Sequence, residues 1–394
     1  MKRLRDQTET ETETETGTEP RRGVAGSRSP RVAIGLVGPN ERGGVLEWLD
    51  AGLRGGRSGR IEAEYPLALD PRRGSLQILA RCDGEFAAHA LGSRVDVDVA
   101  GVSVAVGLIG LVYTEPRWRG LGVATRCLTR CIAELSDGGC SIVVLWSALD
   151  RLYEPLGFRP VGSEWIVSVS ESQCLRAVGP SGSRIQISDP VAADWPLLEE
   201  LYRQNPSPIR RLPGDLQRLA SIPDTRLRVI RRNEEPVAYV CEGRGDDLQG
   251  FVHEWAGDSE GILYGLADLA SRTGRLGCLI GSLREPPVPE LVAAGAHCSE
   301  RPFAWAWVPD PLSLWGTISQ GDPVLRNLRL TALADEFEFA GTHGRVRLDR
   351  GAVTALLLGP QRPAQITPVL SPREYLAVRR RLPWPFFLSG LDSI

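Results

Sequence analysis

Residues 116–127 read PRWRGLGVATRC and place arginines and glycines ahead of a segment with helical periodicity. The first amides of a helix are unpaired and carry the positive end of its dipole, so they attract anions. Gly120 and Gly122 lack a Cβ and let a phosphate approach the backbone, and Arg119 adds a positive charge. The amides of residues 120–125 can therefore converge on a diphosphate. The alternative is an ordinary turn from a strand into a helix.

The surrounding residues predict the elements that would hold this stretch. The apolar run 102–113 reads as a strand, and apolar residues from Val123 to Leu135 recur at helical spacing. SIVVLWS then reads as a buried strand, and ALDRLYEPLGF as a short helix closed by Gly157. With the strand RVAIGLV, a helix and a strand meander before them, these segments predict an α/β unit.

A second unit repeats this order. RIQISD reads as a strand and AADWPLLEELYRQN as an amphipathic helix, followed by a hairpin-like pair, FVHEWA, the helix-like EGILYGLADLAS and the strand CLIGSL. The remainder alternates strands and turns and ends in the helix-like REYLAVRRRL and the apolar WPFFLSGLDSI, which predicts a small α+β module. The expected domains are a disordered low-complexity tail (1–30), the first α/β unit (31–178), its diverged copy (183–310) and the C-terminal module (311–394).

Composition excludes several classes of function. The net charge of −3 comes without the basic stripe that nucleic-acid binding needs, so no nucleic-acid partner is expected. The eight cysteines form no CxxC pair and the four histidines show no ligand spacing, which predicts buried free thiols and no metal. No signal peptide and no apolar stretch of membrane-spanning length occurs, so a cytoplasmic protein without a membrane partner is expected.

Three features together resemble the GCN5-related N-acetyltransferase (GNAT) superfamily. Arg119, Gly120, Gly122 and Ala124 match the RGxGxA loop that holds the pyrophosphate of acyl-CoA. The preceding apolar strand is interrupted by glycines at 107 and 110, a placement that marks a bulge or a close backbone approach. LYEPLGF is similar to the YxxxGF motif that closes the fold. The resemblance implies a mixed, splayed sheet with helices on both faces.

The resemblance also implies a ligand and a reaction. Acetyl-CoA is the expected co-substrate, with no metal, and an amine acceptor attacks the thioester directly. The cofactor-binding residues would be Val112, Tyr113 and Thr114 beside the pantetheine arm and Arg119, Gly120, Leu121, Gly122, Val123, Ala124 and Thr125 around the pyrophosphate. Tyr153 stands where the family places the acid that protonates the departing thiolate, although an aromatic residue merely packing on the sheet would look the same. Asp83, Glu85 and Glu115 are candidate bases.

The order of the modules resembles the enhanced intracellular survival family of acetyltransferases. That family combines a GNAT domain, a second GNAT-like domain without the CoA loop and a sterol-carrier-like C-terminal module. In the second unit here, WAGDSEG puts Asp258 and Glu260 where a phosphate would lie, so this degenerate copy should not bind CoA. In the family the C-terminal carboxylate acts as general base, a role that would fall to Ile394; a packed chain end is the alternative.

Three questions stay open at this level. The acceptor is expected to be a small molecule, with a protein N-terminus or lysine as the alternative. The second and third modules would wall the acceptor pocket and could build a homo-oligomer. A catalytically silent CoA-binding scaffold or regulatory protein is the rival function.

Overall fold

A mixed sheet of twelve strands runs through the part of the chain described by the computed structural model. That part comprises residues 30–179, 184–334 and 336–394. Val32–Ile394 form one unit. Most of the region expected to be a low-complexity tail, residues 1–29, lies outside the described residues.

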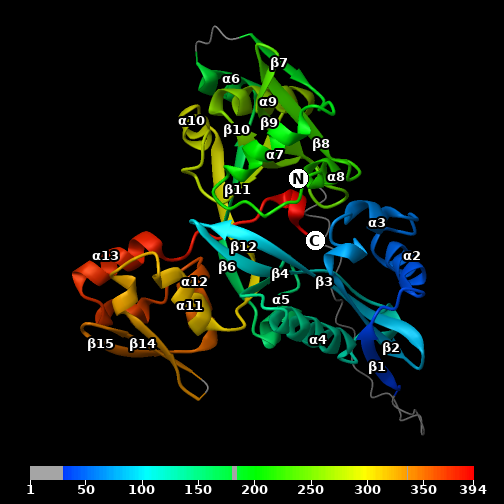
Figure 1. Ribbon diagram of the computed structural model, residues 1–394, viewed down its shortest axis with the longest axis vertical. Coiled ribbons are helices and arrows are strands. Elements are labelled where there is room, and N and C mark those ends of the chain that lie inside the picture. The colour runs from blue at the N-terminus through cyan, green and yellow to red at the C-terminus, as the bar shows by residue number, and fades with distance from the viewer. Residues whose placement is uncertain (1–29, 180–183, 335) are drawn as a thin grey trace, which may run out of the picture. The chain divides into compact units, whose positions relative to one another are not determined.

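The elements of residues 32–178 follow the predicted order (Figure 1). They are β1 (Val32–Leu36), α2 (Arg42–Leu53), α3 (Arg60–Glu64), β2 (Leu76–Cys82), β3 (Glu85–Val99), β4 (Val102–Thr114), α4 (Val123–Asp137), β5 (Ile142–Leu145), α5 (Asp150–Tyr153), β6 (Arg159–Val169) and α6 (Glu171–Val178). Tight turns at Asp83-Gly84 and Ala100-Gly101 join the strands of the expected meander, and all four residues have positive φ. Helices α3 and α6 were not expected from the sequence.

Residues 185–319 repeat this order element by element, as the sequence predicted for most of them. They form β7 (Ile185–Ser188), α7 (Trp195–Arg203), α8 (Asp215–Ala220), β8 (Arg226–Arg232), β9 (Glu235–Glu242), β10 (Phe251–Gly257), α9 (Ser259–Thr273), β11 (Leu276–Ile280), α10 (Val288–Ala293), β12 (His297–Trp307) and α11 (Pro311–Ser319). These two stretches are called the first and second halves below.

The strand order makes the two halves symmetrical. It runs β1-β2-β3-β4-β5-β12-β6-β11-β10-β9-β8-β7. Strands β1 to β6 of the first half correspond to β7 to β12 of the second half. When each strand is replaced by its counterpart, the same order is obtained read backwards. The last strand of each half is exchanged: β12 lies between β5 and β6, and β6 lies between β12 and β11. The two halves therefore share one continuous sheet.

Helices cover both faces of the sheet in each half. Along β2, Ile78 packs in the cluster under α4, and its neighbour Leu79 packs in the cluster under α2. Along β9, Val240 packs under α9 and Tyr239 packs under α7 in the same way. The expected α/β architecture with helices on both faces is confirmed for this sheet.

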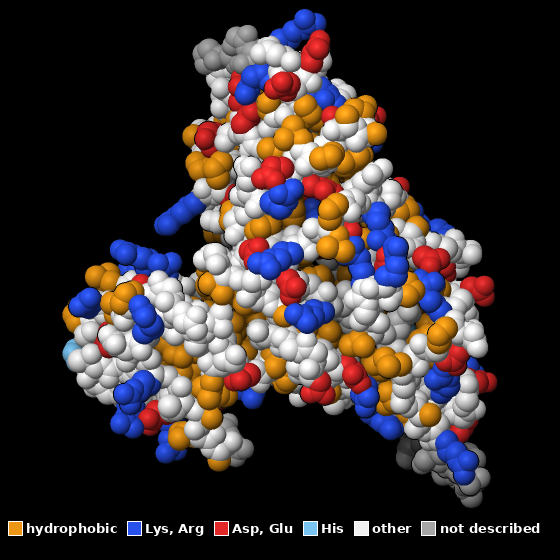
Figure 2. All heavy atoms as spheres, in the orientation of Figure 1, with side chains coloured by type: hydrophobic (Ala, Val, Ile, Leu, Met, Phe, Trp, Pro, Cys, Tyr) orange, Lys and Arg blue, Asp and Glu red, His pale blue; other side chains and the backbone are white. Residues whose placement is uncertain are grey.

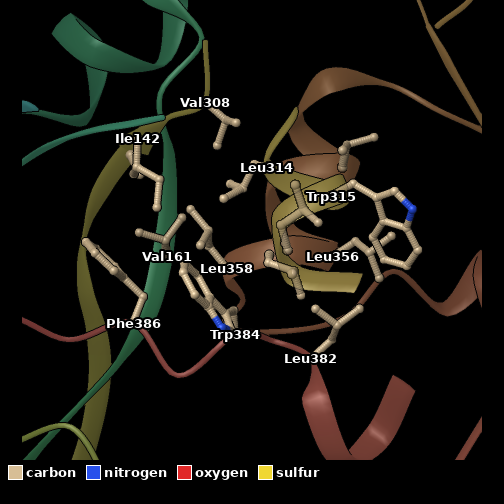
Figure 3. Close-up of a cluster of buried hydrophobic side chains, with 14 of the residues drawn as sticks. Ile142, Val161, Val308, Leu314, Trp315, Leu356, Leu358, Leu382, Trp384 and Phe386 are labelled. Carbon is tan, nitrogen blue, oxygen red and sulfur yellow. The ribbon is translucent and has the colours of Figure 1, made fainter. Parts of the chain in front are cut away.

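The remaining residues pack against the middle of the sheet. They form the three-stranded sheet of β13 (Arg329–Ala332), β14 (Phe337–Gly341) and β15 (Gly344–Leu348) with α12 (Arg350–Leu358) and α13 (Pro372–Arg381). Figure 3 shows the shared core, where Ile142 and Val161 of the large sheet meet Leu358, Trp384 and Phe386. This core anchors residues 383–394, which we call the C-terminal segment.

Charged side chains of both signs are interspersed on the face shown in Figure 2. Many are paired; an example is Arg210 with Asp98, at 2.9 Å. Among the described residues, no helix is long and apolar enough to cross a membrane. The eight cysteines are all free thiols, and seven of them are buried, as the sequence predicted.

Candidate active site

The sheet opens between β4 and β5. The two strands pair in parallel only from Val106 with Ile142 to Leu108 with Val144. Beyond Val144, Leu145 pairs with Trp305 of β12 and no longer with β4. A cavity of about 420 Å³ occupies this region, bordered by residues 109–112 of β4 and by Leu145, Trp146 and Ser147. We call it the splay cavity.

A bulge in β4 borders the splay cavity. His89 pairs with Tyr113 and Leu91 pairs with Gly110, so Leu111 and Val112 together face a single residue of β3. Leu111 has a φ of +47°, which is unusual for a residue with a branched side chain. The bulge withdraws main-chain groups of β4 from the sheet and leaves them beside the cavity.

His89 holds this bulge from inside the protein. Its Nδ1 lies 2.9 Å from the carbonyl oxygen of Leu111, and the side chain is fully buried. Burial lowers the pKa of His89 to about 4, so the ring is neutral near pH 7. A carbonyl can only accept, so Nδ1 carries the proton and donates it to Leu111. The sequence showed His89 only as an isolated histidine.

Close approach explains both glycines that interrupt β4. A Cβ on Gly107 would lie 3.0 Å from Leu135 of α4, and a Cβ on Gly110 would lie 2.3 Å from the carboxyl carbon of Ile394. A side chain at either position would displace its neighbour. The sequence offered a bulge or a close approach here. The glycines allow close approaches, and the bulge follows them at Leu111.

The arginine and glycine loop leads into α4 through two left-handed residues. Gly120 has φ +77° and Gly122, the N-cap of α4, has φ +71°, with open space around both. Arg119 donates from Nε to the carbonyl of Thr114 at 3.2 Å. Among the described residues no side chain caps α4, and its first turn holds no acid. The first amides of α4 therefore keep their capacity for an anion.

The corresponding end of α9 in the second half is already occupied. Asp258 caps it by accepting from the N–H of Gly261 at 2.7 Å. Arg232 pairs with Asp258 at 3.0 Å and with Glu260 at 2.6 Å. A phosphate at this helix end would meet two carboxylates and a capped amide.

Tyr153, the predicted acid, lines the splay cavity. It ends α5 and is 4% exposed, with its ring 6.0 Å from Phe158 in an edge-to-face contact. Burial raises the pKa of Tyr153, against the opposing effect of a hydrogen bond with Ser147. The side chain therefore packs on the sheet and also borders the cavity, so both predicted roles fit its position.

Ile394 reaches the same cavity from the other end of the chain. Its carboxyl group lies against Gly110, and its side chain packs against the hydrophobic cluster that contains Leu111 and residues of α2. Of the predicted cofactor residues, Val112 lines the cavity as well. Tyr113 turns instead toward Trp48, with ring centroids 5.0 Å apart. Residues 119–125 belong to the loop and the first turn of α4 and do not line the splay cavity.

None of the other three candidate bases lines the splay cavity. Glu85 pairs with Arg117 at 2.5 Å on the surface. Glu115 accepts from Nε1 of Trp48 at 2.9 Å. Asp83 lies in the tight turn between β2 and β3.

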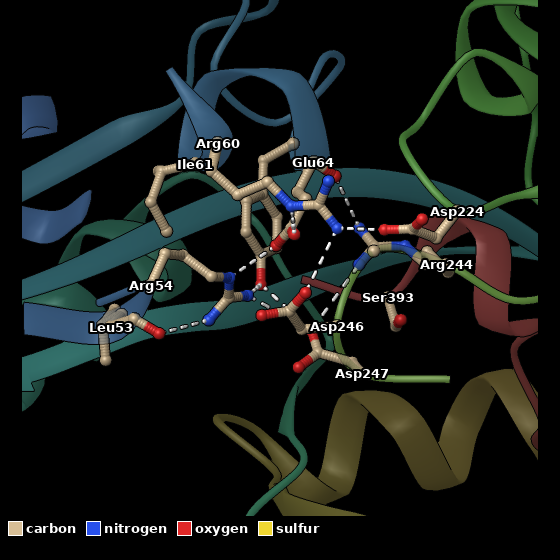
Figure 4. A network of polar contacts seen from close by, with 12 residues as sticks. Leu53, Arg54, Arg60, Ile61, Glu64, Asp224, Arg244, Asp246, Asp247 and Ser393 are labelled. Atoms are coloured by element: carbon tan, nitrogen blue, oxygen red, sulfur yellow. Dashed lines mark hydrogen bonds and ion pairs between the residues drawn. The ribbon is translucent and has the colours of Figure 1, made fainter. Parts of the chain in front are cut away.

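A polar network borders the splay cavity where the two halves meet (Figure 4). Arg54 donates to Glu64 at 2.7 Å and lies 3.5 Å from Asp247 of the second half. Arg244 donates to the main-chain carbonyls of Glu64 and Leu391 at 3.2 and 3.1 Å. Arg244 therefore ties the C-terminal segment to the first half. No sequence pattern indicated the contacts of Arg244, because its partners Leu391 and Glu64 lie 147 and 180 residues away.

A buried charge cluster holds the same segment from the second half. Arg211 pairs at 2.5 Å with both Glu254 and Asp392, and Ser389 donates to Glu254 at 2.6 Å. Burial raises the pKa of Asp392, against the effect of Arg211. Burial would also raise the pKa of Glu254, but Arg211 and two hydroxyl groups hold it below its usual range.

Arg211→Met is expected to destabilise the protein by about 3–5 kcal/mol, because it leaves two buried carboxylates without a cation. Thermal and urea unfolding measure the loss. Arg210→Met is the matched control, since the neighbouring Arg210 pairs with Asp98 at the surface and should change stability little. Equal effects of the two substitutions would contradict the assigned role of the cluster.

Comparison with known proteins finds one matching family model and several solved structures with a similar fold. Residues 62–161 match the family model of an acetyltransferase (GNAT) domain. No curated protein matches the chain at a significant level. A probable N-acyltransferase from Enterococcus faecalis aligns with a TM-score of 0.64 at 12% identity, over 91% of this chain and 98% of that chain.

Two further solved structures are similar over most of their length. A GCN5-related N-acetyltransferase from Anabaena variabilis gives a TM-score of 0.61 at 14% identity, covering 92% of this chain and all of that chain (100%). Eis1 from Mycobacterium abscessus gives 0.55 at 17% identity, covering 84% and 90%. At these identities the likeness establishes the fold.

Proposed function

The chain carries a GNAT acetyltransferase domain in residues 62–161, and from this premise we propose that it moves an acetyl group from acetyl-CoA to the amine of a small molecule. The observation that carries the proposal is the splay cavity. It brings the bulge of β4, Tyr153 and Ile394 to one place beside the open end of β5. The predicted superfamily and enzyme class are confirmed by the family match; the acceptor and the residue roles are proposals.

The donor would lie across the bulge and the arginine and glycine loop. Its pantetheine arm would hydrogen-bond to the main chain at residues 112–114, whose ladder the bulge interrupts. Its pyrophosphate would accept from the amides of residues 120–125, with Arg119 nearby. Support comes from the uncapped start of α4 and the open space around Gly120 and Gly122.

The reaction would proceed by direct attack. The neutral amine nitrogen bonds to the thioester carbonyl carbon, and the resulting tetrahedral intermediate expels the CoA thiolate. The carboxylate of Ile394 would take the proton that the amine loses, and the Tyr153 hydroxyl would give its proton to the thiolate. The position of Ile394 against Gly110 and that of Tyr153 on the same cavity support these two roles.

We assign the second half to a degenerate GNAT-like domain that does not bind CoA. The repeated order of elements supports a common origin of the two halves. Asp258, Glu260 and Arg232 occupy the helix end where a second pyrophosphate would lie. The C-terminal module, which resembles a sterol-carrier domain in its place in the chain, would serve to anchor the C-terminal segment.

Purified protein with acetyl-CoA and a panel of amines tests the function through the release of free thiol. Turnover of at least one small amine is expected. The rival is a CoA-binding scaffold, and it predicts that CoA binds, by titration calorimetry, while no amine on the panel is acetylated. Turnover of a peptide amine in preference to all small amines would favour a protein acceptor.

Leu121→Asp is expected to raise the KM for acetyl-CoA about tenfold without lowering the melting temperature. Leu121 is 51% exposed and precedes the N-cap of α4. A carboxylate here favours the helix dipole but repels a pyrophosphate, so binding and stability should move in opposite directions. Leu121→Asn keeps the size without the charge and should leave the KM within about twofold. An unchanged KM in Leu121→Asp would place the pyrophosphate elsewhere.

A further inference from the structure

A second cavity, of about 510 Å³, lies next to the splay cavity and has no part in the proposed reaction. His253, Leu279 and Phe387 line both cavities and form the wall between them. The other walls come from β6, from β10, from the end of α7 and the residues after it, from the loop between β11 and α10, from the end of α12, and from the C-terminal segment. We call it the tail cavity.

The walls of the tail cavity are mainly apolar and aromatic. Trp255, Trp384 and Phe386 are all at least 95% buried, and the ring of Phe387 packs 4.9 Å from that of Phe303. Further apolar lining comes from Leu279, Ile280, Leu358 and Pro385. These walls are suited to an apolar body rather than to a sugar or a phosphate.

Most polar groups in the lining already have partners within the chain. Glu254 accepts from Arg211, Ser389 and Tyr239. Asn205 donates to the carbonyl of Trp255 at 2.9 Å, and Ser207 donates to that of Pro385 at 3.3 Å. These groups fix the walls. The lining also holds Nδ1 of His253, which has no hydrogen-bond partner among the described residues, and the exposed side chain of Arg284.

Glu285 is different. It is half-buried on the loop between β11 and α10 and lines the tail cavity, and no partner for its carboxyl group occurs among the described residues. Burial raises the pKa of Glu285 to about 7, with no cation acting against it. An ionised carboxylate in apolar surroundings is costly, and a cation brought by a ligand would offset that cost.

We propose that the tail cavity binds a small primary amine with an apolar body, whose ammonium group pairs with Glu285 and whose body packs on Trp384 and Phe386. Charge complementarity favours this ligand over a neutral apolar compound. Arg284 also lines the cavity, but its side chain is exposed and makes no ion pair with Glu285. The other lining carboxylate, Glu254, is already paired with Arg211. The site is separate from acetyl transfer, and binding requires no turnover.

The test is titration calorimetry of 2-phenylethylamine into the full-length protein saturated with CoA, so that no acetyl donor is present. Glu285→Gln is expected to weaken binding about tenfold. Glu290→Gln is the control: Glu290 is an exposed carboxyl on α10 that lines neither cavity, so its loss should leave this affinity unchanged. Thermal melting of Glu285→Gln should show no loss of stability, since the substitution removes an unpaired carboxyl.

Two further measurements keep the result unambiguous. Binding to the wild type should strengthen between pH 6 and pH 8 as Glu285 loses its proton, and this dependence should disappear in Glu285→Gln. 2-Phenylethanol, which lacks the charge, should bind at least tenfold more weakly than the amine. Equal binding of amine and alcohol, equal binding by wild type and Glu285→Gln, or no binding at all would each overturn the proposal. The comparison with Glu285→Gln isolates the tail cavity, because Glu285 does not line the splay cavity, where an acceptor amine would bind.

Discussion

Adding two glycines after Ile394 is expected to lower kcat/KM for amine acetylation roughly 100-fold, the contribution typical of a general base. The extension moves the terminal carboxylate away from Gly110 and puts a neutral amide in its place. A Cβ at Gly110 would already lie 2.3 Å from the carboxyl carbon, so the site has no room for further chain at this point. Activity should partly return at high pH, because a larger fraction of the amine is then already unprotonated and depends less on a general base.

Ile394→Leu is the matched control for the extension, because it alters the side chain and keeps the carboxylate in place. Its kcat should stay within a few-fold of the wild type. Melting temperatures separate a lost base from a detached segment, since Arg211 and Arg244 should still hold Asp392 and Leu391 in the extended protein. Unchanged rates after extension would remove the carboxylate from the mechanism.

Local periodicity predicted most of the first half. The strand 102–113 and the helix starting at Val123 agree with β4 and α4 within a residue or two, and Gly120 and Gly122 have the positive φ that favours glycine. These features depend on neighbours in the sequence, such as the face of α4 that buries Cys127 and Cys131. That is why a single sequence sufficed to predict them.

The exchange of β6 and β12 had no such local signal. The residues of β12 include Glu300, Arg301 and Pro302, so no alternation marked a strand in the middle of a sheet. Its partners β5 and β6 lie more than a hundred residues upstream. The pairing depends on how the two halves meet, which a periodicity argument does not address.

Much of the candidate site depends on similar long-range contacts. Ile394 meets Gly110 across most of the chain, and Arg211 meets Glu254 and Asp392, which lie 43 and 181 residues further along. The sequence supplied residue types without their partners. The left-handed φ of Leu111 was also unpredictable, because leucine does not favour it and the hydrogen bond from His89 helps to hold it.

Tyr153→Phe is expected to lower kcat roughly 100-fold or more while the KM for acetyl-CoA stays within about threefold. The substitution removes only the hydroxyl, so the ring should keep its contact with Phe158 and its place in the wall of the cavity. Tyr375→Phe is the control for loss of a phenol, because Tyr375 is exposed on α13 and does not line the splay cavity. Steady-state kinetics by thiol release measures both variants.

An acetyl donor with an acidic aryl thiol distinguishes an acid from a packing residue. An acidic thiol leaves as a stable thiolate and needs no proton, so Tyr153→Phe should lose much less rate with this donor than with acetyl-CoA. Because burial raises the pKa of Tyr153, the wild type should keep its acid to a higher pH than an exposed tyrosine would. An equal loss with both donors would indicate that Tyr153 shapes the cavity and does not deliver the proton.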